Sequence, residues 1–211
     1  MGGGNSVRAP VSTIPLSLRA NGDRLRALVL HVSRTLLVYA TREGQTEKVV
    51  ARIAQHLRSA GREVQIVNAD DRLAIEKLDL RAFDQLVFGA SMHAGGLEKE
   101  LVEFVNSQSQ LIRDRPRSLF VVLLSAATRN PEIRARSLAD ARQKIEDQLR
   151  VDFDETEFIA GALMYSKYSW PLKWLMKRIA KEAGEDTDTA RDYEYTDWQQ
   201  VEQYAMRLLE R

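Results

Sequence analysis

The chain contains no cysteine, and its three histidines are scattered as His31, His56 and His93. The missing thiols exclude disulfide scaffolds, iron–sulfur clusters, thiolate metal sites and cysteine nucleophiles. The histidines lie too far apart in the sequence to predict a histidine-rich metal site, so we expect no metal ion. Any redox chemistry would therefore need a bound organic cofactor.

An excess of one charge and long apolar runs are also missing. Lysine and arginine number 31 against 30 acids, a net charge of +1, whereas dedicated nucleic-acid binders are usually more basic. We therefore expect no nucleic-acid partner. No apolar run approaches the roughly 20 residues that a membrane-spanning helix needs; the best, Ala27–Ala40, is broken by His31 and Arg34. The 211 residues, 44% hydrophobic, suit one folded α/β domain.

The N-terminal end reads differently from the rest of the chain. Residues 1–33 open with Met-Gly-Gly-Gly-Asn-Ser and include Pro10 and Pro15, which favours a flexible tail. A signal peptide fits poorly because the apolar stretch Val11–Leu18 is short and contains a proline. We therefore expect a flexible N-terminal tail over 1–33 and a folded domain over 34–211.

The body of the chain alternates short β-rich runs with amphipathic stretches. The predicted strands are Thr35–Ala40, Glu63–Asn68, Asp84–Gly89, Ser118–Leu124 and Glu157–Leu163. The predicted helices are Thr46–Ala60, Leu97–Ile112, Pro131–Leu149 and Asp197–Glu210. Strands that are separated by helices need crossovers, and crossovers imply a parallel sheet covered on both faces. The sequence thus predicts a doubly wound five-stranded sheet, with a ligand beyond the carboxyl ends of its strands.

The loop after the first predicted strand has the residues that an anion needs. It reads Thr41, Arg42, Glu43, Gly44, Gln45 and Thr46, and it enters a helix at once. A glycine turn, two hydroxyls and a helix N-terminus together favour a phosphate site. The loop has neither a Walker lysine nor the dinucleotide glycines, so a monophosphate fits better. The alternative is an ordinary turn in which Thr46 is the N-cap of the helix.

This hydroxyl-rich loop in a five-stranded βα chain resembles the phosphate loop of the flavodoxins. The resemblance implies the sheet order 2-1-3-4-5 and FMN at the point where that order reverses. It also implies that the loops after strands three and four flank the isoalloxazine ring. The implied cofactor-binding residues there are Ala90, Ser91, Met92, His93, Ala94, Gly95, Ser125, Ala126, Ala127, Thr128 and Arg129.

Sequence motifs near the C-terminus point to a particular family among the flavodoxin-like proteins. Ile159–Leu163 is followed by Tyr165, and later come Thr187-Asp-Thr189 and Tyr195-Thr-Asp-Trp198. Together with the phosphate loop, these motifs make residues 34–210 resemble the flavodoxin-type, menaquinone-dependent protoporphyrinogen oxidases. The family implies FMN-dependent oxidation of protoporphyrinogen IX in haem biosynthesis. It also implies menaquinone or another quinone as acceptor, at the inner face of the cell membrane. Where the family has aromatic and basic residues after strand three, this chain has Met92–Leu97.

A basic aromatic segment follows the fifth predicted strand. Tyr165–Lys181 holds five basic residues and no acid, and we interpret it as a helical insertion. Tryptophan and lysine on one face suit an anionic membrane surface or a carboxylated tetrapyrrole. The candidate substrate or membrane contacts are Tyr165, Tyr168, Trp170, Trp174, Lys177 and Lys181. The alternative is a solvated helix whose tryptophans pack on neighbouring loops. We expect a cytoplasmic protein that is peripheral on the inner face of the membrane.

Other classes of function stay open at this point. A flavodoxin-like electron carrier would dock by a strongly acidic surface, which the net charge of +1 disfavours. An FMN-dependent quinone reductase, or a protein that kept the fold and lost the flavin, is a further alternative. His93 could contact a flavin or donate a proton, or it could be an ordinary exposed loop histidine. No carboxylate pair or catalytic triad stands out, so the sequence names no catalytic residue, and it indicates no oligomeric state.

Overall fold

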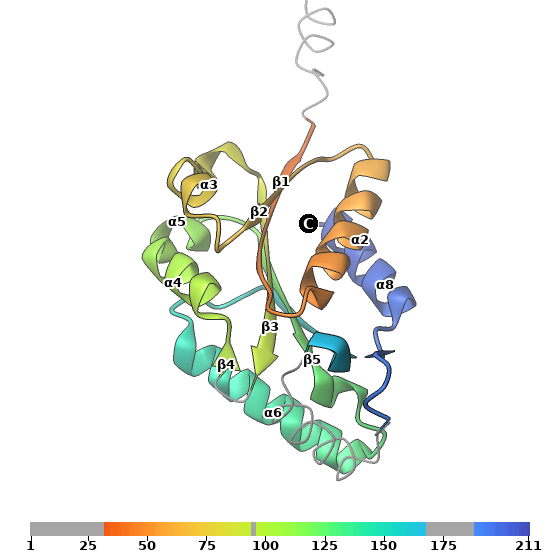
Figure 1. The fold of residues 1–211 in the computed structure, drawn as a ribbon. Coiled ribbons are helices and arrows are strands. Elements are labelled where there is room, and N and C mark those ends of the chain that lie inside the picture. The colour runs from red at the N-terminus through yellow and green to blue at the C-terminus, as the bar shows by residue number, and fades with distance from the viewer. Residues whose placement is uncertain (1–31, 94–95, 168–187) are drawn as a thin grey trace, which may run out of the picture. The chain divides into compact units, whose positions relative to one another are not determined.

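A computed structural model describes residues 32–93, 96–167 and 188–211, and it contains a parallel sheet with helices on both faces (Figure 1). The parallel strands are β1 (Arg34–Ala40), β2 (Glu63–Asn68), β3 (Gln85–His93), β5 (Arg117–Leu123) and β6 (Glu155–Ala160). Their order is β2-β1-β3-β5-β6, which is 2-1-3-4-5 when only the parallel strands are counted. The predicted doubly wound fold is therefore confirmed.

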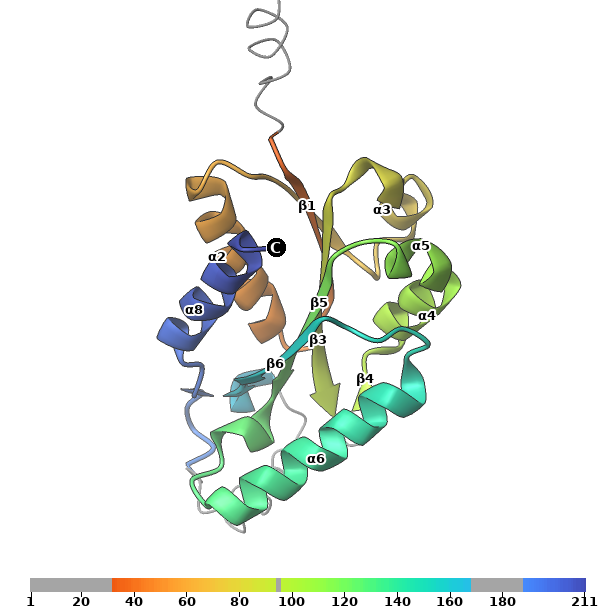
Figure 2. The same cartoon turned by 180° about the vertical axis from the view of Figure 1, so that it is seen from behind.

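Helices cover the two faces of the sheet in separate groups (Figures 1 and 2). On one face lie α2 (Gln45–Ser59) and α8 (Trp198–Leu209); on the other lie α3 (Arg72–Glu76), α4 (Lys99–Ser107) and α5 (Ser109–Arg113). The long helix α6 (Pro131–Gln148) passes the tip of β3 at the carboxyl end of the sheet. Short 3-10 turns occur at η1 (Leu80–Ala82), η2 (Leu124–Ala127) and η3 (Tyr165–Lys167).

Strand β1 is buried on both faces, which explains its uninterrupted apolar sequence. Leu36 and Val38 belong to one core cluster, and Leu37 and Tyr39 belong to the cluster beneath α2 and α8. The parallel register aligns Ala40 at the end of β1 with Ala90 on β3. The loop that follows β1 therefore emerges beside the last residues of β3.

Strand β3 is longer than the sequence predicts. The expected strand stops at Gly89, but β3 runs to His93 and folds back onto β4 (Gly96–Leu97). In this antiparallel pair His93 faces Gly96, so the expected loop is partly a continuation of the sheet. Of the predicted flavin-flanking residues, Ala94 and Gly95 lie outside the described residues.

Two other predicted elements are divided. The predicted helix Leu97–Ile112 is two helices, α4 and α5, which meet at Gln108. The fifth predicted strand ends at Ala160, and after Gly161 the short β7 (Ala162–Leu163) pairs with β8 (Tyr193–Glu194) instead. The predicted flexible tail and the basic helical insertion lie almost wholly outside the described residues. Among the residues that the structure does describe, no helix combines the length and the apolar character needed to cross a bilayer.

Candidate functional site

The turn between β1 and α2 is shaped by a left-handed glycine. Gly44 has φ 92° and ψ 0° and is the N-cap residue of α2, without any side-chain capping bond. Its own N–H donates to Thr41 Oγ1 over 3.0 Å. Among the described residues no side chain caps the amides of the first helical turn, and these amides together with the helix dipole suit an anion.

The first two residues of α2 carry buried polar atoms beside this turn. Gln45 and Thr46 are 5% and 0% exposed. Within the described residues, Gln45 Oε1 and Thr46 Oγ1 have no hydrogen-bond partner. Buried polar atoms are nearly always paired, so these two atoms fit a polar ligand. The alternative that Thr46 is the helix N-cap is wrong, because that position belongs to Gly44.

The Tyr-Thr-Asp-Trp motif, residues 195–198, stabilises the turn between β1 and α2. Gln45 Nε2 donates to Thr196 Oγ1 over 2.8 Å, and Thr196 Oγ1 donates to the carbonyl of Ala160 over 2.7 Å. The next residue, Asp197, is the N-cap of α8 and accepts from two amides of its first turn. Thr196 therefore joins the start of α2 to the end of β6, while Asp197 starts the helix beside it.

A pocket lies at the carboxyl ends of the strands, where sheets of this topology bind their ligands. The described residues that line it are Thr41, Glu43, Gln45, Thr46, Ser91, Met92, His93, Val122, Leu123, Leu124, Gly161 and Ala162. The first seven were singled out from the sequence. The last five were missed, although the rule that ligands sit beyond the strand ends applies equally to β5 and β6.

Several predicted residues do not line this pocket among the described ones. They are Arg42, Gly44, Ala90, Ser125, Ala126, Ala127, Thr128 and Arg129. After β5 the chain turns at once into η2, so Leu124 rather than Ser125 reaches the pocket. Thr128 is buried away from it, and Arg129 is exposed.

An acidic residue that sequence reasoning missed contacts residues of the site. Glu98 is 5% exposed and accepts hydrogen bonds from Arg42 Nε at 3.1 Å and Ser91 Oγ at 2.9 Å. His93 Nε2 lies at ion-pair distance from two carboxylates, 3.1 Å from Glu98 Oε1 and 3.5 Å from Glu43 Oε2. Glu98 was expected inside a helix, and the reversal of β3 onto β4 brings it beside Ser91 and His93.

Tyr165 does not have the position that was predicted for it. Its side chain is fully buried with Leu163 and lies edge-on to Tyr193, with ring centroids 6.3 Å apart. Tyr165 is therefore a packing residue and not a membrane or substrate contact. The other predicted contacts, Tyr168, Trp170, Trp174, Lys177 and Lys181, lie outside the described residues.

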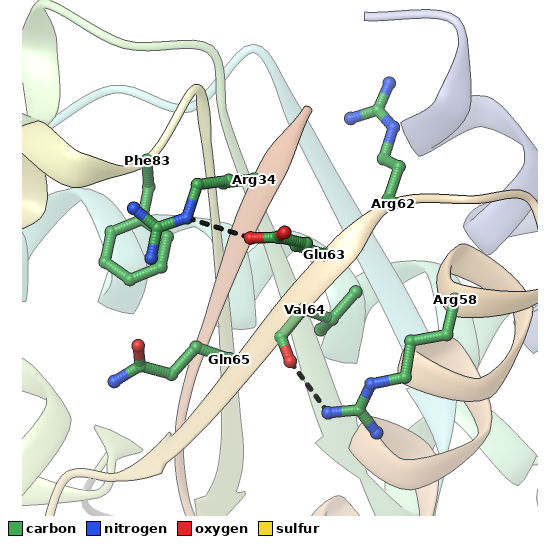
Figure 3. A pocket seen from close by; sticks show the side chains of 7 residues that line it. All are labelled: Arg34, Arg58, Arg62, Glu63, Val64, Gln65 and Phe83. Carbon is green, nitrogen blue, oxygen red and sulfur yellow. Dashed lines mark hydrogen bonds and ion pairs between the residues drawn. The ribbon is translucent and has the colours of Figure 1, made fainter. Parts of the chain in front are cut away.

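A second hollow lies at the opposite end of the sheet, beside the first residues of β1 and β2 (Figure 3). Its three arginines already have partners. Arg58 donates to the carbonyl of Val64, Arg34 pairs with Glu63, and Arg62 donates to the side chain of Gln85. These guanidinium groups are occupied by contacts within the protein, and the hollow is remote from the carboxyl ends of the strands. The pocket at those carboxyl ends is therefore the candidate site.

Comparisons with known proteins show the fold and the family. The flavodoxin domain model matches residues 36–190. Protoporphyrinogen IX dehydrogenase (quinone) of Escherichia coli strain K12 is 31% identical over 175 residues, which is 83% of this chain and 94% of that protein. The protein of the same name from Leishmania major is 24% identical over 173 residues, 82% of this chain and 73% of its own length. Oxidised flavodoxin 1 from Bacillus cereus shares the fold, with TM-score 0.50 and 15% identity, covering 84% and 98% of the two chains.

The fold and the site define a flavodoxin-like oxidoreductase. More particularly, the chain belongs to the flavodoxin-type protoporphyrinogen IX dehydrogenase family, and its cofactor is FMN. The uncapped start of α2 and the unpartnered hydroxyl of Thr46 fit the phosphate of that cofactor.

Proposed function

We propose that this chain oxidises protoporphyrinogen IX to protoporphyrin IX in haem biosynthesis and passes the electrons to a membrane quinone, menaquinone. The relatives in Escherichia coli and Leishmania major support the substrate and the class of acceptor through their names. The observation in this chain that carries the proposal is the buried, unpartnered Thr46 hydroxyl at the uncapped start of α2.

Each part of the site has a role in this reaction. FMN, when bound, supplies the group that accepts a hydride from the substrate. Thr46 and the first amides of α2 hold its phosphate, and the helix dipole favours the negative charge. The bridge from Gln45 through Thr196 to Ala160 fixes the turn. Apolar side chains at the carboxyl end of β5 limit the access of water to the pocket; they include Val122 and Leu123.

We also propose that the protein is cytoplasmic and peripheral on the inner face of the membrane. The support is compositional: Tyr165–Lys181 combines five basic residues and two tryptophans with no acid. Basic residues are attracted to anionic lipid, and tryptophan favours the interface. Such a placement would bring the flavin site near a quinone that is dissolved in the bilayer.

The test of the proposed function is an anaerobic assay with purified protein. The mixture contains FMN, protoporphyrinogen IX and a water-soluble menaquinone analogue, and the fluorescence of protoporphyrin IX is recorded. We expect porphyrin to form without any protein partner and to depend on FMN. An electron carrier would form no porphyrin under these conditions, and that result would contradict the proposal. The Thr46→Val variant, at the same subsaturating FMN concentration, should be slower through lower occupancy.

A further inference from the structure

Arg42 follows the carboxyl end of β1 and lies beside the flavin pocket without lining it. Its neighbours in the chain, Thr41 and Glu43, both line the pocket. The Arg42 side chain is 68% exposed, and its Nε donates to Glu98 Oε2 over 3.1 Å. A guanidinium also carries N–H groups on its two Nη atoms. Within the part of the chain that the structure describes, these Nη atoms have no partner, so they are available to a ligand.

The buried carboxylate of Glu98 fixes the direction in which the Arg42 side chain turns. Glu98 is 5% exposed, and its Oε1 accepts from Ser91 Oγ over 2.9 Å. Glu98 is the N-cap residue of α4, yet its side chain makes no capping bond among the described residues. Because Ser91 lines the pocket, the guanidinium is held at the pocket rim. A side chain that is already held loses less entropy when it binds a ligand.

This direction separates Arg42 from the phosphate site. The polar side chains of the phosphate site, Gln45 and Thr46, belong to α2, and Gln45 bonds to Thr196 just before α8. Helices α2 and α8 cover one face of the sheet, whereas α4, which begins after Glu98, covers the other (Figure 1). The Nη atoms of Arg42 therefore suit a second anionic group rather than the phosphate of FMN.

The charges of the pocket indicate what this second group is. Among the described residues that line the pocket, Glu43 is an acid and none is a lysine or an arginine. A porphyrinogen is an apolar macrocycle with two propionate groups, which are ionised at neutral pH. Propionates are therefore placed more favourably at the rim than inside the pocket. The planar fork of a guanidinium matches a carboxylate with two parallel hydrogen bonds.

We propose, on the basis of the function proposed above, that Arg42 determines substrate specificity by binding one propionate of the porphyrinogen at the rim of the flavin pocket. Nε donates to Glu98, and the Nη groups donate to the propionate. This contact orients the macrocycle, so that its apolar ring is directed toward the pocket while its charged group stays in the more polar surroundings outside.

The contact is tested by porphyrin binding, separately from turnover. FMN-loaded protein is titrated with protoporphyrin IX and with its dimethyl ester in the same detergent, and the fluorescence anisotropy of the porphyrin gives the dissociation constants. We expect wild type to prefer the diacid. Arg42→Gln should bind the diacid about fivefold more weakly or worse, the scale of an ion pair at a partly exposed arginine, and should bind the ester like wild type.

Two further variants test whether the loss is specific. Arg42→Lys should recover only part of the diacid affinity, because an ammonium group lacks the planar fork. Arg58→Gln is the matched control, because it removes the same charge at the opposite end of the sheet. The dissociation constant of FMN is measured in parallel with flavin-free protein, and we expect Arg42→Gln to leave it within twofold of wild type.

Three results would overturn the role of Arg42. The first is diacid binding by Arg42→Gln that equals wild type. The second is an equal loss for diacid and ester, which would show a structural role. The third is a loss of FMN affinity as large as the loss of diacid affinity, which would place Arg42 on the phosphate. Wild-type protein that binds neither porphyrin and leaves porphyrinogen unoxidised would overturn the proposed function itself, a result distinct from unchanged binding in Arg42→Gln.

Discussion

Gln45 and Thr196 share a hydrogen bond of 2.8 Å although 151 residues separate them in the sequence. Both side chains are buried, and Thr196 passes the connection on to the carbonyl of Ala160. The phosphate loop and the Tyr-Thr-Asp-Trp motif are therefore joined by hydrogen bonds in the folded protein. These hydrogen bonds give a physical reason why a motif near the C-terminus occurs together with a phosphate loop near the start of the domain.

Thr196→Val should destabilise the protein and weaken FMN binding together. The change removes two hydrogen bonds in the interior, the one that the Gln45 amide donates and the one that the Ala160 carbonyl accepts. An unsatisfied buried group costs about 1–3 kcal/mol. We expect a lower urea midpoint and a larger dissociation constant, measured by quenching of flavin fluorescence. Thr156→Val on β6 is the control, and equal behaviour of the two variants would contradict the bracing role of Thr196.

Thr46→Val should weaken FMN binding at least tenfold. A hydrogen bond to a charged group contributes about 1.5–3 kcal/mol, and 1.4 kcal/mol corresponds to about tenfold in affinity. Without flavin the variant should be as stable as wild type or more so, because the hydroxyl it removes is buried and unpartnered. An unchanged dissociation constant in a protein with the wild-type circular dichroism spectrum would place the phosphate elsewhere.

Glu194 should contribute stability that is lost in acid. The hydrogen bond from Lys48 lowers the pKa of Glu194, aided by one from Trp198 and opposed by partial burial. A carboxyl whose folded pKa is lowered stabilises the protein above its unfolded pKa, and this stability disappears as the pH falls through the folded pKa. Glu194→Gln should therefore melt below wild type at pH 7, and the gap should close at acidic pH. A gap that is constant with pH would show that the charge of Glu194 contributes nothing.

The basic aromatic segment should bind anionic lipid. Each basic residue near such a surface contributes about 1 kcal/mol, so replacing both Lys177 and Lys181 by Gln should weaken partitioning roughly thirtyfold. Sedimentation with vesicles that contain phosphatidylglycerol measures this, and added salt should weaken binding of the wild type. Replacing the exposed Arg134 and Arg136 by Gln is the control for net charge. If both double variants bind like wild type, the segment does not face the membrane.

The strands themselves and most of the phosphate loop could be predicted from the sequence because both depend on local patterns, whereas the order of the strands was implied only by the resemblance to the flavodoxins. The apolar run of β1 is visible because that strand is buried on both faces. The hydroxyls and glycine of the loop are adjacent in the chain, so Thr41, Gly44 and Thr46 are recognisable together. The position of Gly44 as a left-handed N-cap, two residues before the start of the expected helix, could be found only from the backbone.

The acidic part of the site could not be predicted in this way. Glu98 reaches His93 only because β3 continues past Gly89 and reverses onto β4, a long-range pairing that alternation alone does not reveal. The burial of Tyr165 could not be predicted for a related reason. An aromatic residue next to a basic segment suggests an interface, whereas its burial against Tyr193 depends on the pairing of β7 with β8.

The most direct test of the whole account is a single anaerobic turnover with no quinone present. FMN-loaded protein is mixed with a limiting amount of protoporphyrinogen IX, and the flavin and porphyrin absorbances are recorded together. The account predicts that the flavin is bleached as porphyrin forms, in the proportion that two electrons per flavin require, and that a quinone added afterwards restores the yellow colour. A flavin that stays oxidised while porphyrinogen remains unconsumed would contradict the account.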